Sequence, residues 1–298
     1  MSYESAVSTS AFWTEPDRRV PRIALMGEFS AGKSTLANLM IGANPLPVQV
    51  VATQLPPVWM TYGAAPAVIV DLKGAETPCD IDTLQGVSPS DTAFIKYFSE
   101  EDILGQCDII DMPGISDPNM SSAVWERVLP FADAVVWCTP AMQAWRQSEA
   151  AVWAGIDEDI RRKSILVVTR ADMLLNEVDR NKVLKRVEAE TRNLFAHVVM
   201  MSLTQAQSVE QNDALWAESG ADVFVARFME MVASIERDLS GQRADETHVT
   251  ARGAGQITPP DARPVTPRRP TSKSRRVYPE QTSEPRSPDP ATYMPKFS

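Results

Sequence analysis

The sequence predicts an α/β fold in which a mainly parallel sheet carries helices on both faces. Apolar strands alternate with helical segments along residues 21–239, which is the pattern of a doubly wound sheet. Two of the strands, 134–139 and 164–169, are apolar in the way expected for strands buried on both faces. The chain has 298 residues, of which 44% are hydrophobic, so it can bury a large core.

The strands and helices are expected in a regular order. Short runs rich in branched and aromatic residues predict strands at 21–26, 58–61, 67–72, 94–98, 108–111, 134–139, 164–169 and 198–201. Apolar residues at helical spacing predict helices at 33–42, 148–156, 180–195 and 221–239. Gly42 and Pro45 end the first helix, and residues 73–91 show no regular pattern. The helix at 221–239 has one apolar face, made of Phe224, Phe228, Met231, Val232, Ile235 and Leu239.

Residues 27–34 link the first strand to the first helix and fit G-x-x-x-x-G-K-[ST], the phosphate-binding P-loop. The glycines let backbone N–H groups approach a phosphate, and the helix start adds the positive end of its dipole. Lys33 can reach the β- and γ-phosphates, and the Ser34 hydroxyl can ligate Mg²⁺. The alternative is a chance strand–turn–helix. The apolar strand before the loop and the apolar helix after it favour a nucleoside triphosphate site on a P-loop NTPase fold.

Asp111 and Gly114 fit a second element, D-x-x-G, at the end of the apolar strand 108–111. The carboxylate is expected to hold Mg²⁺, usually through a water, and the glycine N–H to contact the γ-phosphate. An ordinary Asp-x-Pro-Gly turn is the alternative. The position after a buried strand and downstream of a P-loop favours the metal site.

Thr169, Arg170 and Asp172 follow the strand 164–169 and match the [N/T]-K-x-D element of GTPases, with Arg in place of Lys. The carboxylate of Asp172 can accept two hydrogen bonds from guanine, whereas adenine lacks these donors and would leave the charge unpaired. Arg170 can still cover the base, because its guanidinium stacks well on π-faces. The alternative is a helix-capping Asp. The element therefore favours GTP over ATP.

Thr53 lies in a proline-punctuated loop, 43–57, between the first helix and the next strand. GTPases carry a switch threonine in this place, and its hydroxyl and carbonyl close over Mg²⁺ and the attacking water. Other threonines are candidates in another alignment. Thr53 is favoured because the segment leads directly into the strand at 58–61.

These elements together resemble the dynamin family of large GTPases, especially the bacterial dynamin-like proteins, over roughly residues 20–240. The segment 27–36 has the narrow form G-x-[F/S]-S-A-G-K-S-[ST]-L. Thr53 is followed by Pro56, and the later elements come in the family's order. The gap between Thr53 and Asp111 is longer than small Ras-like GTPases allow.

The resemblance implies which residues touch the nucleotide. Besides Gly114, Thr169, Arg170 and Asp172, it assigns contacts to Gly27, Glu28, Phe29, Ser30, Ala31, Gly32, Lys33, Ser34 and Thr35. A guanine-edge element should follow the last strand, and residues 201–204, with Ser202, are a loose match. The resemblance implies Mg²⁺ as cofactor, on Ser34, Thr53 and Asp111.

The resemblance also implies a mechanism. Ile115 stands where Ras-like proteins have a water-orienting Gln, which dynamin relatives lack. They use the P-loop serine, here Ser30, to stabilise charge on the β–γ bridge and to help hold a monovalent cation (K⁺ or Na⁺). Lys33, Thr53 and Ser30 are thus the catalytic candidates, although Ser30 could merely bond backbone. Hydrolysis is then completed when two GTPase domains dimerise across the nucleotide.

Three regions are predicted: a lead-in at 1–20, a dynamin-like GTPase domain at 21–247 and a disordered tail at 248–298. Ten of the last 48 residues are proline, and such a segment buries too little apolar area to offset its ordering entropy. The tail contains P-x-x-P spacings at 264–270, which suit either a polyproline ligand or a plain solvated segment. No long stalk is expected after the domain, so the resemblance implies either a separate stalk-bearing partner or a smaller regulatory role. Basic tail residues such as Arg275 and Arg276 suit peripheral contact with anionic lipid.

Charge and cysteine content exclude several classes. Residues 251–298 hold nine Lys/Arg and four Asp/Glu, which gives this segment a formal charge of +5. Since the whole chain has a formal charge of −10, residues 1–250 carry −15. An acidic body binds nucleic acid poorly. The three cysteines (Cys79, Cys107 and Cys138) have no metal-ligand spacing and are expected to be buried reduced thiols. No secretory signal or membrane-spanning run is found, so a cytoplasmic protein is expected.

Two other functions fit parts of the sequence. The first is a GTP-binding switch or scaffold with little turnover, which controls a partner through the tail. The second is a ribosome-associated GTPase of the Era type, against which the acidic body argues. Hydrolysis measurements separate the first from a GTPase, and salt-sensitive RNA binding would indicate the second.

Overall fold

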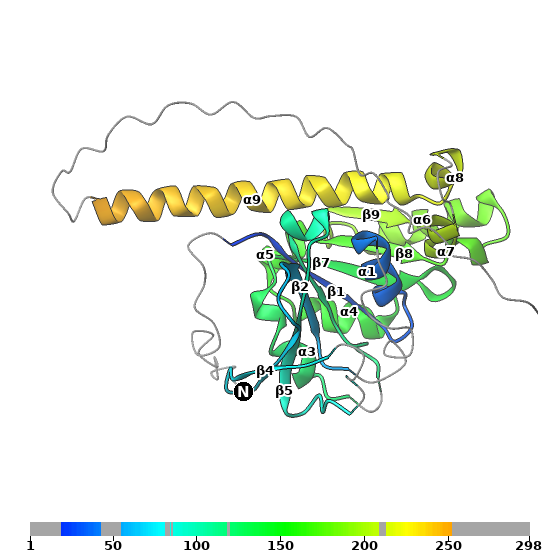
Figure 1. Cartoon of the computed structure of the whole chain (residues 1–298). Coiled ribbons are helices and arrows are strands. Elements are labelled where there is room, and N and C mark those ends of the chain that lie inside the picture. Colours follow the sequence, from blue (N-terminus) through cyan, green and yellow to red (C-terminus); the bar gives the residue numbers. More distant parts are fainter. Residues whose placement is uncertain are drawn as a thin grey trace, which may run out of the picture. The chain divides into compact units, whose positions relative to one another are not determined.

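A nine-stranded sheet forms the centre of the computed structural model (Figure 1), which describes residues 19–42, 55–80, 84, 86–117, 120–208 and 213–251. Side chains are described as far as residue 241. Thr53, the lead-in before residue 19 and the tail after residue 251 lie outside the described residues. The three-region division therefore stays a prediction.

The strand order is β4-β3-β5-β2-β6-β1-β7-β8-β9. The strands are β1 (Arg22–Gly27), β2 (Val58–Tyr62), β3 (Val68–Asp71), β4 (Glu76–Pro78), β5 (Thr92–Ser99), β6 (Asp108–Asp111), β7 (Ala134–Pro140), β8 (Ile165–Thr169) and β9 (His197–Met200). Five neighbouring pairs are parallel, and three pairs, β2–β6, β3–β4 and β3–β5, are antiparallel. The mainly parallel sheet is confirmed. The short edge strand β4 lies in the stretch expected to be irregular.

Helices cover both faces of this sheet, as the sequence predicts. Helices α1 (Lys33–Ile41), α7 (Leu203–Ser208) and α9 (Ala221–Ala251) contribute to a buried cluster on one face. Helices α3 (Ala123–Glu126), α4 (Gln147–Ala154) and α6 (Glu177–Glu190) contribute to a second cluster on the other face. Because alternate residues of the central strands enter opposite clusters, β1, β7 and β8 are buried on both sides.

Helix α9 extends further than its apolar face predicts, to Ala251 (Figure 1). The predicted inner face is buried from Phe224 to Leu239 and packs on the same side of the sheet as α1. Two further short helices, α5 (Glu158–Lys163) and α8 (Asp213–Glu218), are found in the described part of the chain. Like α3 and α7, they were not predicted from the sequence. None of the helices in the described ranges is long and apolar enough to cross a bilayer.

Helix α6 differs from its predicted bounds at both ends. It begins at Glu177, where the Asn176 side chain accepts a hydrogen bond from the backbone N–H of Asp179 and so caps the helix. The predicted range, 180–195, missed this cap. The helix ends before Thr191, and the residues that follow it place Phe195 in a stack against Trp153 with ring centroids 4.1 Å apart. Aromatic packing, rather than helical periodicity, therefore explains the apolar residues near 195.

Candidate functional site

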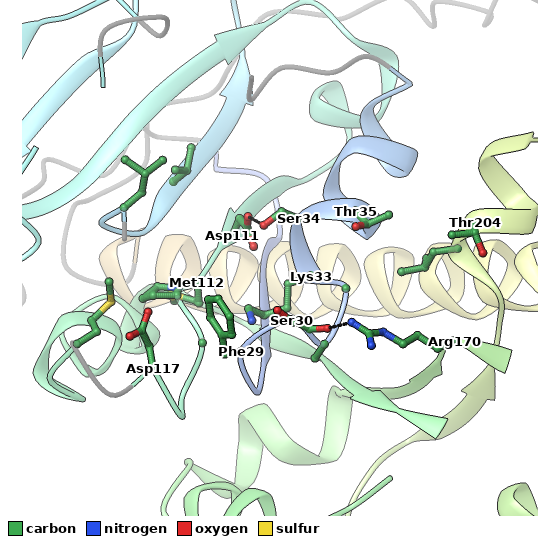
Figure 2. Close-up of a pocket in the computed structure, with 18 of the residues that line it drawn as sticks. Phe29, Ser30, Lys33, Ser34, Thr35, Asp111, Met112, Asp117, Arg170 and Thr204 are labelled. Atoms are coloured by element: carbon green, nitrogen blue, oxygen red, sulfur yellow. Dashed lines mark hydrogen bonds between the residues drawn. The ribbon is translucent and has the colours of Figure 1, made fainter. Parts of the chain in front are cut away.

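A pocket of about 540 Å³ lies where β1, β6 and β8 end and α1 begins. It collects three stretches that are far apart in the sequence, around Lys33, Asp111 and Arg170 (Figure 2). The third stretch includes Asp172. The carboxyl ends of parallel strands meet at one edge of a sheet, and this edge is where open α/β folds bind ligands. The sequence predicts these stretches as one site, and the fold brings them together.

The first glycine of the loop is fixed by packing as well as by its conformation. Gly27 has φ of +138°, and a Cβ added there would lie 2.1 Å from the carbonyl oxygen of Cys138 on β7. Gly32 has φ of +96° and immediately precedes α1. Only glycine adopts such φ values without strain, so both positions require it. The turn between them aims the start of α1 into the pocket.

Residues of β8 and of the turn after it hold the middle of the loop. The Thr169 hydroxyl donates to the carbonyl oxygen of Ala31 at 2.8 Å. The Arg170 guanidinium donates to the carbonyl oxygen of Ser30 at 2.6 Å, which Figure 2 marks with a dashed line. Ser30 and Arg170 both have left-handed backbone conformations, with φ of 57° and 58°. The predicted base-binding element therefore also positions the phosphate-binding loop.

Phe29 lies at the rim of the pocket, and its side chain is 59% exposed. Its backbone N–H donates to the Ser116 hydroxyl at 3.1 Å. Gly114 packs closely on it, since a Cβ at Gly114 would lie 2.7 Å from the Phe29 Cα. The D-x-x-G turn and the loop after β1 thus share a close backbone contact, which explains a glycine at position 114.

Lys33 points back into the loop that it follows. Its ammonium group donates to the carbonyl oxygens of Glu28 at 2.8 Å and Gly27 at 3.3 Å, and the residue is only 7% exposed. Burial lowers the pKa of Lys33, and the nearby Asp111 carboxylate opposes that shift. A buried cation that rests on two carbonyl oxygens can transfer its contacts to an anion that enters the pocket.

Asp111 and Ser34 form a site suited to a divalent cation. The Ser34 hydroxyl donates to Oδ2 of Asp111 at 2.6 Å. Oδ1 of Asp111 is buried and has no hydrogen-bond partner among the described residues. Burial raises the pKa of Asp111, whereas the Ser34 hydrogen bond lowers it. A buried carboxylate oxygen without a partner, beside a hydroxyl, is the donor set that Mg²⁺ prefers.

Asp172 and Ser202 meet at the other end of the pocket. The Ser202 hydroxyl donates to Oδ1 of Asp172 at 2.7 Å, and Ser202 is fully buried. The pocket wall here is formed by Asp172, Met173, Leu203 and Thr204, while Ser202 lies behind it. The hydroxyl therefore orients the carboxylate and does not itself face the cavity.

The predicted site residues fall into three groups. Eleven line the pocket: Phe29, Ser30, Ala31, Gly32, Lys33, Ser34, Thr35, Asp111, Gly114, Arg170 and Asp172. Four do not line the pocket but contact residues that do or pack beside them: Gly27, Glu28, Thr169 and Ser202. Thr53 lies outside the described residues.

Sequence reasoning missed several lining residues, namely Leu55, Pro56, Val58, Met112, Pro113, Asp117, Met120, Met173, Leu203 and Thr204. Most of them directly follow or lie within a predicted element. Most of them are apolar residues or residues common in turns, which also occur in loops that bind no ligand. The sequence therefore carried no signal that distinguishes them from residues with a purely structural role. Thr204 lies in the stretch 201–204 that the sequence reading matched only loosely.

Comparisons with known proteins all find similarity to dynamins. A model of the dynamin family matches residues 23–171. Dynamin-like protein 2 of Campylobacter jejuni is 24% identical over 200 residues, which are 64% of this chain and 33% of that protein.

Two solved structures of an oligomerised bacterial dynamin pair, described as a mechanism for long-range sensing and tethering of membranes, share this fold. They align with TM-scores of 0.54 and 0.53 at 17% identity, over 76% and 72% of this chain. Those alignments cover 37% and 35% of the solved chains, so this chain spans about a third of the length of the relatives it matches.

Proposed function

The chain belongs to the dynamin family, and on that premise we propose that it binds GTP and hydrolyses it to GDP and phosphate with Mg²⁺. The observation that carries the proposal is the shared pocket of Lys33, the Ser34–Asp111 pair and Asp172. One wall suits phosphates, another a metal ion and the far end a guanine base. All three parts line one cavity, which supports their use by a single bound GTP.

The phosphate end is formed by the loop and the start of α1. Backbone N–H groups at the N-terminus of α1 and the Lys33 ammonium supply positive charge toward the β- and γ-phosphates. Ser34 and Asp111 would hold Mg²⁺, which neutralises charge that develops on the phosphate oxygens. The Asp111 oxygen without a hydrogen-bond partner supports this role.

The base end supports guanine. Asp172 presents a carboxylate to the cavity, and the Ser202 hydroxyl fixes its orientation. Two donors on the guanine edge complement that carboxylate, whereas adenine would leave it unpaired in a desolvated site. Arg170 flanks the same end and gives the base a planar cation to stack on.

We assign Ser30 and Thr53 to the hydrolytic step. Ser30 lines the pocket beside Lys33, where its hydroxyl can stabilise charge between the β- and γ-phosphates. Thr53 would orient the attacking water. Ile115 cannot do this by hydrogen bonding, so we propose that dimerisation of two GTPase domains across the nucleotide completes the site, with K⁺ or Na⁺ as an additional charge. The exposed Phe29 at the rim suits such a contact.

We further propose that residues 21–247 act as the GTPase domain together with a stalk-bearing partner at a membrane. Two similarities support this: the family match, and the bacterial dynamin pair that senses and tethers membranes. The basic segment after residue 250 would contribute peripheral contact with anionic lipid. Vesicle sedimentation with and without that segment tests the membrane part of the proposal.

The decisive experiment measures GTP hydrolysis against protein concentration, with Lys33→Ala as the inactive variant. A specific rate that rises with protein concentration supports activation by dimerisation, and a flat but measurable rate removes that step. Tight GTP binding with background hydrolysis at every concentration would instead indicate the low-turnover switch. Tighter binding of ATP than of GTP would overturn the base assignment.

A further inference from the structure

We propose that Glu28 is a positioning residue. Its carboxylate fixes the phosphate-binding loop through an ion pair with Arg146 and a hydrogen bond from Ser148, both at the start of α4. This inference rests on the proposed nucleotide-binding function. Glu28 lies within the phosphate-binding loop, and the residues that hold its side chain, Arg146 and Ser148, lie outside all the motifs described above. A carboxylate at this position has the same sign as a triphosphate, so its placement decides whether the loop can accept the ligand.

Both carboxylate oxygens of Glu28 are engaged away from the pocket. Oε2 pairs with Nη1 of Arg146 at 2.7 Å, and Oε1 accepts from the Ser148 hydroxyl at 2.7 Å. The Glu28 side chain is 10% exposed, whereas that of Arg146 is 44% exposed. The pair therefore neutralises the loop's negative charge and leaves no free carboxylate oxygen beside the cavity.

The other partner in this contact is rigidly anchored. The backbone N–H of Arg146 donates to Oε2 of Glu149 at 2.8 Å, and Glu149 is fully buried. Glu149 also accepts from the Trp137 indole at 2.8 Å and from the Thr139 hydroxyl at 3.0 Å, both on β7. The start of α4 is thus fixed to the sheet by a satisfied buried carboxylate, which gives Glu28 a stationary point to hold.

Glu28 also supports Lys33, through its backbone carbonyl group. The carbonyl oxygen of Glu28 accepts from Nζ of Lys33 at 2.8 Å and from the backbone N–H of Ala31 at 3.2 Å. Holding the Glu28 side chain therefore holds the carbonyl on which Lys33 rests. Preorganised groups bind a ligand more tightly because they lose less freedom on binding.

The test measures the affinity of the full chain for fluorescent methylanthraniloyl-GDP, with the melting temperature followed in parallel. Arg146→Met should weaken binding by about tenfold, because it leaves the negative charge of Glu28 within the phosphate-binding loop without its cation. Glu28→Ala should weaken binding by a similar factor, because the loop loses its anchor. The double variant should be no weaker than either single variant, since the two residues act as one unit.

Two further variants separate positioning from simple stability. Arg146→Lys keeps the charge and should retain affinity within about threefold of the original. Arg162→Met removes an exposed arginine that pairs with Glu158 on α5, and it should leave affinity unchanged. Losses that add in the double variant, or a lower melting temperature with unchanged affinity, would overturn the inference. Failure of the unaltered protein to bind the labelled GDP would overturn the proposed function itself.

Discussion

The hydroxyl of Ser34 lies 2.6 Å from Oδ2 of Asp111, although the two residues are 77 positions apart. Ser34 is the second residue of α1, and Asp111 is the last residue of β6. Their contact exists because β1 and β6 are parallel neighbours in the sheet, with Leu25 opposite Asp111. The remaining Asp111 oxygen is buried without a partner in the described part of the chain, and this is where we expect Mg²⁺.

The first prediction concerns this pair. Ser34→Ala should raise the Mg²⁺ concentration needed for half-maximal GTP hydrolysis, and Asp111→Asn should lower kcat/KM by about a hundredfold or more, because metal ligands supply several kcal/mol of transition-state stabilisation. Steady-state kinetics across a Mg²⁺ titration provide the measurement. Asp179→Asn, on the exposed side of α6, is the matched control. An unchanged Mg²⁺ requirement in both site variants would contradict the assignment.

The second prediction concerns base selection. Asp172→Asn should reduce GTP affinity by about tenfold or more and improve binding of xanthosine triphosphate, because the amide can donate to the extra carbonyl of xanthine while it no longer accepts both guanine donors. Ser202→Ala should give a smaller loss, about threefold, since it only frees the Asp172 carboxylate to rotate. Competition binding with GTP, ATP and xanthosine triphosphate measures both effects. Equal losses for all three nucleotides would indicate damage to the fold.

The third prediction compares two glycines with positive φ. Gly27→Ala should destabilise the protein by about 3 kcal/mol or more, because the new Cβ would collide with the backbone of β7. Gly42, at the end of α1, has φ of +72° and no atom within 4 Å of an added Cβ. Its replacement by Ala should cost only about 1 kcal/mol of left-handed strain. Urea unfolding of both variants gives the two free energies, and similar values would contradict the β1–β7 packing.

The fourth prediction uses the three thiols. Burial raises the pKa of Cys107 and of Cys138 to about 12. Cys79 is partly exposed, which corrects the expectation that all three are buried. Its remaining burial also raises its pKa. Because only the thiolate reacts, a thiol with a pKa of about 12 is roughly 0.01% reactive at pH 8.

Ellman's reagent should therefore modify one thiol of the folded protein at pH 8 and three after unfolding in urea. The fast reaction should accelerate as the pH rises, since deprotonation of Cys79 increases, and it should disappear in Cys79→Ser. Rapid modification of two or three thiols in the folded state would show that β7, or the residue before β6, is more accessible than the structure has it.

Much of the fold could be predicted from local sequence patterns. Helix α1 begins at Lys33 and ends before Gly42 as predicted, because a P-loop and a left-handed glycine are short-range signals. The buried face of α9 was read correctly from its spacing alone. Helix α6 was misplaced at its start, since its capping residue lies outside the apolar pattern. Strand β4 was missed because three exposed residues at a sheet edge carry no periodicity.

The sequence by itself predicted the chemistry of the site: which residues would hold phosphate, metal and base, and in what order they occur. Each of those assignments depends on a few adjacent residues and on the strand before them. Only the tertiary structure decided how Glu28 is held, that Ser202 lies behind Asp172, and that Arg170 fastens Ser30. Such contacts join residues 30 to 140 positions apart. They depend on strand order, which no local pattern encodes.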